Sequence, residues 1–245
     1  MRCIYWVLPL SVLLGSCPTT GEWLEQIGKT GAVGQLTQQE IVAGLKAALD
    51  KGVDHAVSQL GREGGFFQNV EVRIPVPERL QPVERALRTV GQGSLVDEFQ
   101  LAINRAAEKA VPEAVSVLVN SVEQMTFADA EQILRGHETA ATDFFRRTSE
   151  ANLYQRFLPI VKDATARSGV TAAYKRMTDN PLAVVAAQAV LGRESVDLDA
   201  YVTTRALDGL FLKIAEQEKL IRKNPAERTT EILRRVFGSV LAKRS

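Results

Sequence analysis

"TQQEIVAGLKAALDKGVDHAVSQL", at residues 37–60, contains the clearest structural signal in the chain. Thr37 is followed three residues later by Glu40, which is the spacing of a capping box at the start of a helix. Apolar residues then recur every three or four positions, at Ile41, Leu45, Leu49, Val53, Val57 and Leu60. Gly61, the first of three glycines in five residues, is a helix-stop signal. The stretch predicts an amphipathic helix with one face in a core.

Helical patterns also fill the chain from Pro82 to near its end. At Pro112 the pattern either kinks or starts a new helix, because proline removes a backbone donor. Residues 224–227, Asn-Pro-Ala-Glu, combine a cap, proline at the first position and glutamate at the third. The predicted helices are 82–90, 94 to about 112, 127–135, 140–148, 151–166, 170–177, 181–191, 198–223 and 225–241. The sequence therefore predicts an all-α fold, an irregular multi-helix bundle.

One segment departs from the helical pattern. Within residues 66–77, Val70, Val72, Ile74 and Val76 alternate with polar residues, as in an extended segment with one buried face. Prolines at 75 and 77 exclude a central strand. We expect either an extended strap over the helices or half of a small hairpin, and favour the strap.

The N-terminus carries an export signal. Arg2 precedes a short uncharged run that is too short to span a membrane. The run ends in "LLGSC" at residues 13–17, which resembles the lipobox of bacterial lipoproteins. The resemblance implies that residues 1–16 are a signal peptide, cleaved between Ser16 and Cys17, and that Cys17 carries the lipid. The alternative is a plain signal peptide with an incidental cysteine.

The residues after the cleavage position suggest a destination. Pro18 stands where inner-membrane retention would place aspartate, so the resemblance to Gram-negative lipoproteins implies a lipid anchor in the outer membrane, facing the periplasm. Residues 17–36 contain four glycines and are expected to form a tether. Residues 37–245 are then long enough for a single helical domain with its own core.

Composition excludes several kinds of stabilisation and partner. The chain has two cysteines, and Cys3 would be lost with the leader, so no intramolecular disulfide can form. Without the leader the chain has 29 basic and 29 acidic side chains, a net charge of zero. Interspersed charges of zero net sign do not predict binding of nucleic acid. The expected partners are the membrane, through the lipid, and an envelope protein or a lipid.

Several longer phrases resemble a bacterial family of exported helical proteins, domain of unknown function 4197. These phrases are "GLKAALDKGVDHAV" at 44–57, "RIPVPERL" at 73–80, "AINRAAEKA" at 102–110, "MTFADAEQILRGHETAATDFFR" at 125–146 and "LDGLFLKIAEQEKLIRKNPAERTTEILRRVFG" at 207–238. The resemblance implies a helical domain over about residues 37–238. It implies no reaction, ligand or catalytic residue.

The sequence contains no recognisable catalytic or metal-binding motif. His55 and His137 have no second histidine at ligand spacing, so we expect no metal and no cofactor. "GQGS" at 91–94 lacks the strand and the following glycine of a nucleophile elbow, and is better explained as a helix cap.

Six polar residues remain as candidate ligand or partner contacts. They lie beside buried helix faces or near helix ends: Asn104, Glu108, Asp129, Thr142, Arg146 and Arg222. The first interpretation is that they make interhelical contacts. The second is that they line one polar groove, where Glu108 with Arg146 or Arg222 could hold a ligand. Acid–base chemistry by Glu108 and Asp129 is a third interpretation. Asp143 and Arg147 are expected to pair with each other in solvent.

Two functional hypotheses follow. The first is a non-enzymatic binding or interaction module of the cell envelope. The alternative is a carrier of a hydrophobic ligand, since "PLAVVAAQAVL" at 181–191 is uncharged and rich in small residues. A helix buried on all sides explains that segment equally well.

Overall fold

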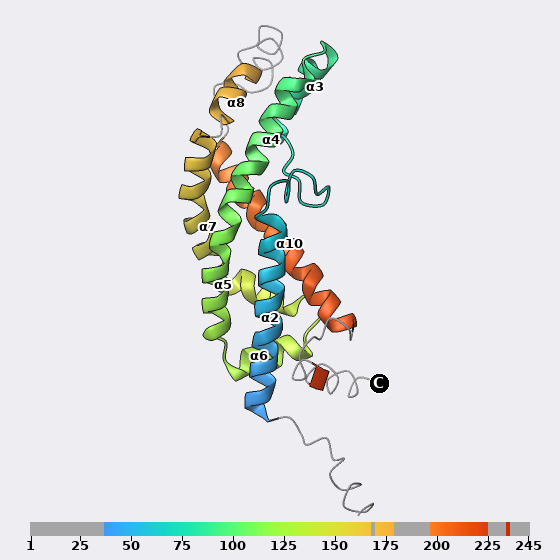
Figure 1. The fold of residues 1–245 in the computed structure, drawn as a ribbon, viewed down its shortest axis with the longest axis vertical. Helices are drawn as coiled ribbons and strands as arrows, with labels where there is room; N and C mark the ends of the chain where they lie inside the picture. The colour runs from blue at the N-terminus through green and yellow to red at the C-terminus, as the bar shows by residue number, and fades with distance from the viewer. Residues whose placement is uncertain (1–36, 168–169, 179–196, 225–233, 236–245) are drawn as a thin grey trace, which may run out of the picture. The chain divides into compact units, whose positions relative to one another are not determined.

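A computed structural model describes residues 37–167, 170–178, 197–224 and 234–235 (Figure 1). The predicted leader and tether, with Ser16 and Cys17, lie outside these residues. The helix predicted at 181–191 and nearly all of that at 225–241 do as well.

The all-α prediction is confirmed. In chain order the elements are α2 (Gln38–Leu60), the 3₁₀ turn η1 (Glu78–Leu80), α3 (Gln81–Thr89), α4 (Gly93–Ala110), the 3₁₀ turn η2 (Val111–Glu113), α5 (Ala114–Glu123), α6 (Phe127–Arg135), α7 (Ala140–Arg167), α8 (Val170–Thr178) and α10 (Leu198–Lys223). The residues that the structure describes contain no β-strand.

Local signals set the ends of two helices. Thr37 and Glu40 form the expected capping box of α2, with the Glu40 amide donating to the Thr37 hydroxyl (3.2 Å) and the Thr37 amide donating to the Glu40 carboxylate (2.9 Å). Thr126 and Asp129 repeat the same arrangement at the start of α6, which ends before Gly136 as predicted. These boxes satisfy backbone donors that a helix start leaves unpaired.

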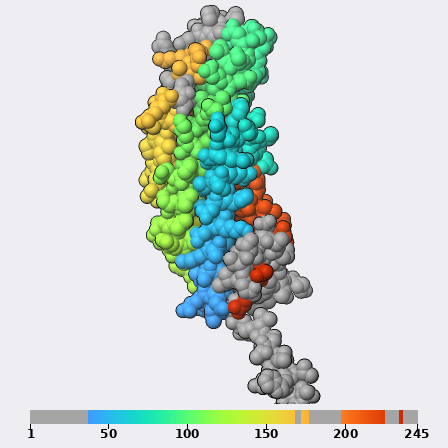
Figure 2. All heavy atoms as spheres, viewed as in Figure 1, coloured from blue at the N-terminus to red at the C-terminus, as the bar shows by residue number. Residues whose placement is uncertain are grey.

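The core lies where the long helices meet. Helix α10 packs along α7 and α2, and α4 packs along α7 and α8 (Figure 1). On one face the surfaces of α2, α5 and α7 adjoin (Figure 2). Phe99 of α4, Phe145 and Phe157 of α7, and Phe211 of α10 are fully buried between these helices. Each buried phenylalanine contributes about 1.5–3 kcal/mol through apolar burial, so these contacts hold the bundle together.

The predicted break between residues 148 and 151 needs correction, and the two alternatives at Pro112 are decided. The helices predicted at 140–148 and 151–166 are one helix, α7, because no glycine or cap interrupts them and the buried face continues through Ser149 and Leu153. The Ser149 hydroxyl shares a hydrogen bond with that of Ser121 on α5 (2.5 Å), so the predicted break lies against the core. At Pro112 the chain forms the short turn η2 and then starts α5.

Residues 61–77, here called the strap, cross α4 and α10 without forming a helix or a strand. Val72, Ile74 and Val76 are buried, as their alternation predicted. Val70 is 84% exposed, because the amides of Val72 and Arg73 donate to the Asn69 carbonyl and the resulting turn carries Val70 outward. The strap interpretation holds for 72–76, and the burial expected of Val70 was wrong.

Within the described residues, every helix is too short or too polar to cross a membrane.

Candidate functional site

Asn104 on α4 holds the strap by its backbone. Its amide oxygen accepts from the Ile74 N–H (2.8 Å), and its amide nitrogen donates to the Ile74 carbonyl (2.9 Å). The nitrogen also donates to the carbonyl of Gln100 one turn earlier (2.7 Å). Asn104 is fully buried, so all of these bonds lie away from water. The first interpretation of the sequence expected an interhelical contact, whereas the tertiary partner of Asn104 is the backbone of the strap.

Glu108 lies one turn further along α4 and contacts the start of the strap. Its Oε1 atom accepts from the amides of Phe66 (3.0 Å) and Phe67 (3.3 Å), and the residue is 4% exposed. Unlike Asn104, Glu108 also lines an open cavity.

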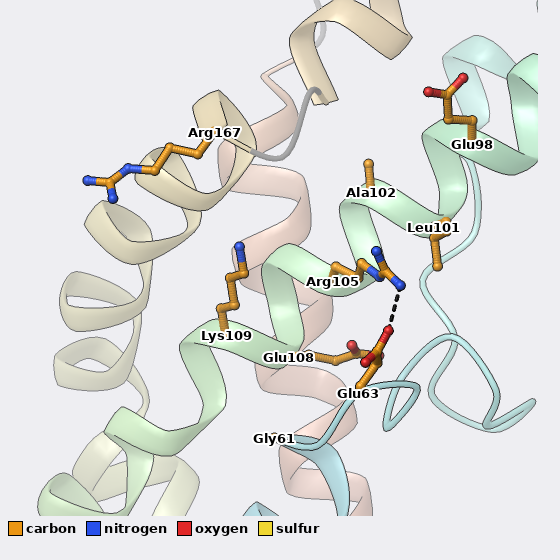
Figure 3. Close-up of a pocket in the computed structure, with 9 residues that line it drawn as sticks. All are labelled: Gly61, Glu63, Glu98, Leu101, Ala102, Arg105, Glu108, Lys109 and Arg167. Atoms are coloured by element: carbon orange, nitrogen blue, oxygen red, sulfur yellow. Dashed lines mark hydrogen bonds and ion pairs between the residues drawn. The ribbon is translucent and has the colours of Figure 1, made fainter.

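This cavity has a volume of about 620 Å³ and lies between the end of α2, α4 and the end of α7 (Figure 3). We call it the α4 cavity. Its lining residues are Gly61, Glu63, Glu98, Leu101, Ala102, Arg105, Glu108, Lys109 and Arg167. The volume is within the range of small-molecule sites, and the lining carries three carboxylates and three basic groups.

Most of the charged groups around the α4 cavity are paired. Arg105 donates to Glu63 (2.6 Å), across the cavity in Figure 3. Glu98 accepts from Arg176 of α8 (2.5 Å). Arg167 donates to Asp163 on its own helix (2.7 Å), and Lys109 also has an interaction partner. Glu108 accepts only the two strap amides among the described residues.

A second cluster joins Thr142 and Arg222 through Glu218, at the start of α7. One Glu218 oxygen accepts from the Ala141 amide and from the Arg222 guanidinium (2.9 and 2.7 Å). The other accepts from the Thr142 amide and hydroxyl, both at 2.9 Å. Arg222 also donates to the Ile133 carbonyl of α6 (2.8 Å). Glu218 is therefore a cap for α7 supplied by α10, and the negative carboxylate suits the positive end of the helix.

An apolar cavity of about 20 Å³ adjoins this cluster. It lies between the first half of α2 and α10, lined by Leu45, Ala48, Leu49, Gly52, Ala141, Ile214, Glu218, Ile221 and Arg222. Such a volume holds about one water molecule.

Comparison with known proteins identifies the family. Residues 35–238 match the family described as "Protein of unknown function (DUF4197)". The chain belongs to this family. The comparisons with curated proteins and with solved structures give no match. The matched region contains the strap, the α4 cavity and the Glu218 cluster, so these features lie in the family domain and not in a flanking segment.

The remaining candidates of this family member contact separate neighbours. Arg146 donates to Glu150 (3.1 Å), lies 3.7 Å from Asp208 and stacks over the ring of Phe211 (4.5 Å). The six sequence candidates therefore do not share one groove. The lining of the α4 cavity includes Gly61 at the end of α2, and that of the small cavity beside Glu218 extends along α2 to Gly52. These two positions are about 14 Å apart by helical rise.

Asp129 has a structural role as the third residue of the α6 capping box. Its hydrogen bonds from Thr126, and secondarily the nearby Arg147, hold the pKa of its carboxyl below the usual range. Arg147 lies 3.7 Å from Asp129, while Asp143 accepts from His137 (2.9 Å). The predicted pair of Asp143 and Arg147 was wrong, because the helix start brings other partners closer. Within the described ranges, no three His, Cys, Asp or Glu residues converge on a metal position.

Sequence reasoning missed Glu218 and Lys213, both on α10. Lys213 is 3% exposed and its ammonium donates to Glu71 of the strap and to Glu216 (2.8 Å). Burial alone would lower its pKa, but the hydrogen bonds to Glu216 and Glu71 outweigh burial and raise it. Glu218 falls within a charge run that begins at Glu216 and is typical of a solvated face, and Lys213 lies just before that run. No local signal marks either residue as buried.

Two buried side-chain oxygens in the described residues accept no hydrogen bond. These are Oδ1 of Asp50 on α2 and Oγ1 of Thr203 on α10. Burial, and then the charges of Asp54 and Glu123, raise the pKa of Asp50. Neither Asp50 nor Thr203 lines one of the described cavities. We therefore interpret these two oxygens as a local energetic cost of folding and not as part of a binding site.

Proposed function

We propose that this protein is a non-enzymatic binding module of the cell envelope, held at the periplasmic face of the outer membrane by a lipid on Cys17. The observation that supports binding is the α4 cavity, about 620 Å³ in volume and lined by six charged side chains. A solvated cavity of this size offers both shape and directional polar contacts.

The hydrogen-bond partners of the other candidate residues support the same proposal. Asn104 is occupied by the backbone of Ile74, and Thr142 and Arg222 by Glu218. Acid–base chemistry requires two such groups to converge on one substrate position. Asn104 and Glu108 instead bind different residues of the strap, and Arg146 contacts Glu150, so the geometry favours recognition over reaction.

Carriage of an acyl chain has less support from the described residues. The apolar cavity beside α2 has about 20 Å³, which is room for one water molecule and not for a hydrocarbon chain. The segment 181–191 that suggested a carrier lies outside the described residues.

The binding proposal is tested by blocking the α4 cavity. Leu101 lines the cavity from α4, and Leu101→Trp would fill part of it. Leu212→Trp is the matched control, since Leu212 is an exposed leucine of α10 outside that lining. Native mass spectrometry of the full chain, purified from its membrane, should show a bound mass that Leu101→Trp removes and Leu212→Trp retains. A bound mass that survives both substitutions, or none in the wild type, would contradict the proposal.

The location is tested separately with Cys17→Ala. The variant should move from the membrane to the soluble periplasmic fraction with its helical circular dichroism unchanged, because a lipid anchor requires the thiol. Cys3→Ala is the control and should leave the protein in the membrane. Membrane retention of Cys17→Ala would refute the lipid anchor.

A further inference from the structure

We infer that the α4 cavity binds a small cationic ligand, through contact of an ammonium or guanidinium group with the carboxylate of Glu108. The inference rests on the proposed binding function and names the class of ligand.

The first step concerns the charge of Glu108. Glu108 holds the strap by accepting hydrogen bonds from two backbone N–H groups on one oxygen, Oε1. An amide oxygen could accept the same two bonds. Asn104, one turn away on the same helix, holds the strap with an amide. Anchoring therefore does not require a negative charge at position 108.

The second step is that this charge lies at the wall of the cavity without a cationic partner. Glu108 is 4% exposed as a residue and lines the α4 cavity, where an opposite charge would stabilise its carboxylate. Within the part of the chain that the structure describes, Glu108 accepts from the two strap amides on Oε1 and forms no ion pair with a Lys, Arg or His. The buried carboxylates of Glu218 and the buried ammonium of Lys213, in contrast, each have an opposite charge within 3.0 Å.

The third step is access. Glu108 lines the α4 cavity, so a ligand group can reach it from solvent. The lining carries three carboxylates and three basic groups, so its formal charges balance. Glu63 and Glu98 are each paired with an arginine, and every side chain of those two pairs is 47% exposed or more. Such surface pairs are weak enough to rearrange around a ligand. Oε2 of Glu108 is the acceptor that remains for the cation.

The test uses three probes of similar length: 1,5-diaminopentane, 1,5-pentanediol and glutarate. Each is titrated into ¹⁵N-labelled full-length protein at low ionic strength, and the amides of Phe66 and Phe67 report on Glu108 directly. We expect the diamine to shift these two resonances saturably, and the diol and the dianion to leave them in place. Equal or stronger shifts with glutarate would overturn the inference.

Glu108→Gln isolates the charge, because its amide oxygen can still accept from the strap. Diamine binding should weaken by about tenfold, since a hydrogen bond to a charged group is replaced by a neutral one. Leu101→Trp is a second variant that leaves the strap bonds of Glu108 intact and should abolish the diamine shifts. It keeps the test valid if Glu108→Gln fails to fold. Unchanged diamine binding in either folded variant would overturn the inference.

The two proposals fail separately. If Leu101→Trp removes the bound mass from the native protein but the diamine does not bind, the cavity is a binding site and the cationic class is wrong. If the bound mass is insensitive to Leu101→Trp, the binding proposal itself fails.

Discussion

Glu218→Ala removes a carboxylate that four donors share. In the wild type the two oxygens accept from the amides of Ala141 and Thr142, from the Thr142 hydroxyl and from Arg222. Glu218 is 8% exposed, and the side chain of Arg222 is 13% exposed. Truncation to alanine therefore removes the Glu218 carboxylate from a largely buried guanidinium and leaves the start of α7 without this cap.

The expected cost is about 3–5 kcal/mol, the range for breaking one partner of a buried ion pair. The cavity beside the cluster has only about 20 Å³, so little water can enter to replace the lost acceptor before the protein relaxes. Glu218→Gln should cost nearly as much, because either orientation of its amide directs an N–H₂ donor at a backbone N–H donor. Thr142→Val, which removes only the hydroxyl bond, should cost about 1 kcal/mol.

The measurement is urea unfolding followed by helical circular dichroism, with the slope compared between variants. The matched control is Glu138→Ala, because Glu138 also has two basic partners, Lys219 and Lys223, but is 47% exposed. We expect its free energy of unfolding to change by less than about 0.5 kcal/mol. A loss below about 1 kcal/mol for Glu218→Ala, with an unchanged slope, would refute the capping role.

Four further changes test the packing of the strap and of α2 and the burial of the Asp50 carboxyl. Gly209→Ala places a methyl group 2.8 Å from a phenyl carbon of the strap and should destabilise the fold by about 1–3 kcal/mol. Gly52→Ala places its methyl group 3.8 Å from the nearest side-chain atom and should stabilise the fold by about 0.5–1 kcal/mol through helix propensity. If urea unfolding showed that both glycine substitutions change the free energy of unfolding in the same direction, this packing would be contradicted. Asn104→Ala should leave the Ile74 amide unpaired and speed its hydrogen exchange, while the Ile74 carbonyl keeps the long bond from Gln100 (3.4 Å). An unchanged exchange rate would exclude the clamp. Asp50→Asn should be more stable than the wild type at pH 7. Burial raises the folded pKa of Asp50 above its unfolded pKa. The contribution of this carboxyl to the free energy of unfolding is therefore fully present below the unfolded pKa and is lost as pH rises through the folded pKa. The advantage of the variant should therefore disappear on acidification, and an advantage that persists at pH 3 would show another cause.

Several features of the fold could be read from short stretches of sequence. The capping boxes at Thr37 and Thr126 each depend on two residues three positions apart, so they are visible without any tertiary information. The same holds for the burial of Ile74 and its neighbours, since alternation of side chains along an extended chain is a local property. The leader that predicts export is likewise a contiguous pattern.

The candidate site depended on contacts between residues far apart in the chain. The sequence alone established an all-α domain, the ends of several helices and a strap that cannot be a central strand. The sequence could not show that Glu108 and Asn104 differ in their access to a cavity, because both lie beside the same buried face of α4 and both bind the strap. Only the tertiary structure decided that one of them meets an open cavity, and that the charged side chains of Glu218 and Lys213 are buried. The physical reason is that a charge acquires its cost and its partner only when distant helices exclude water around it.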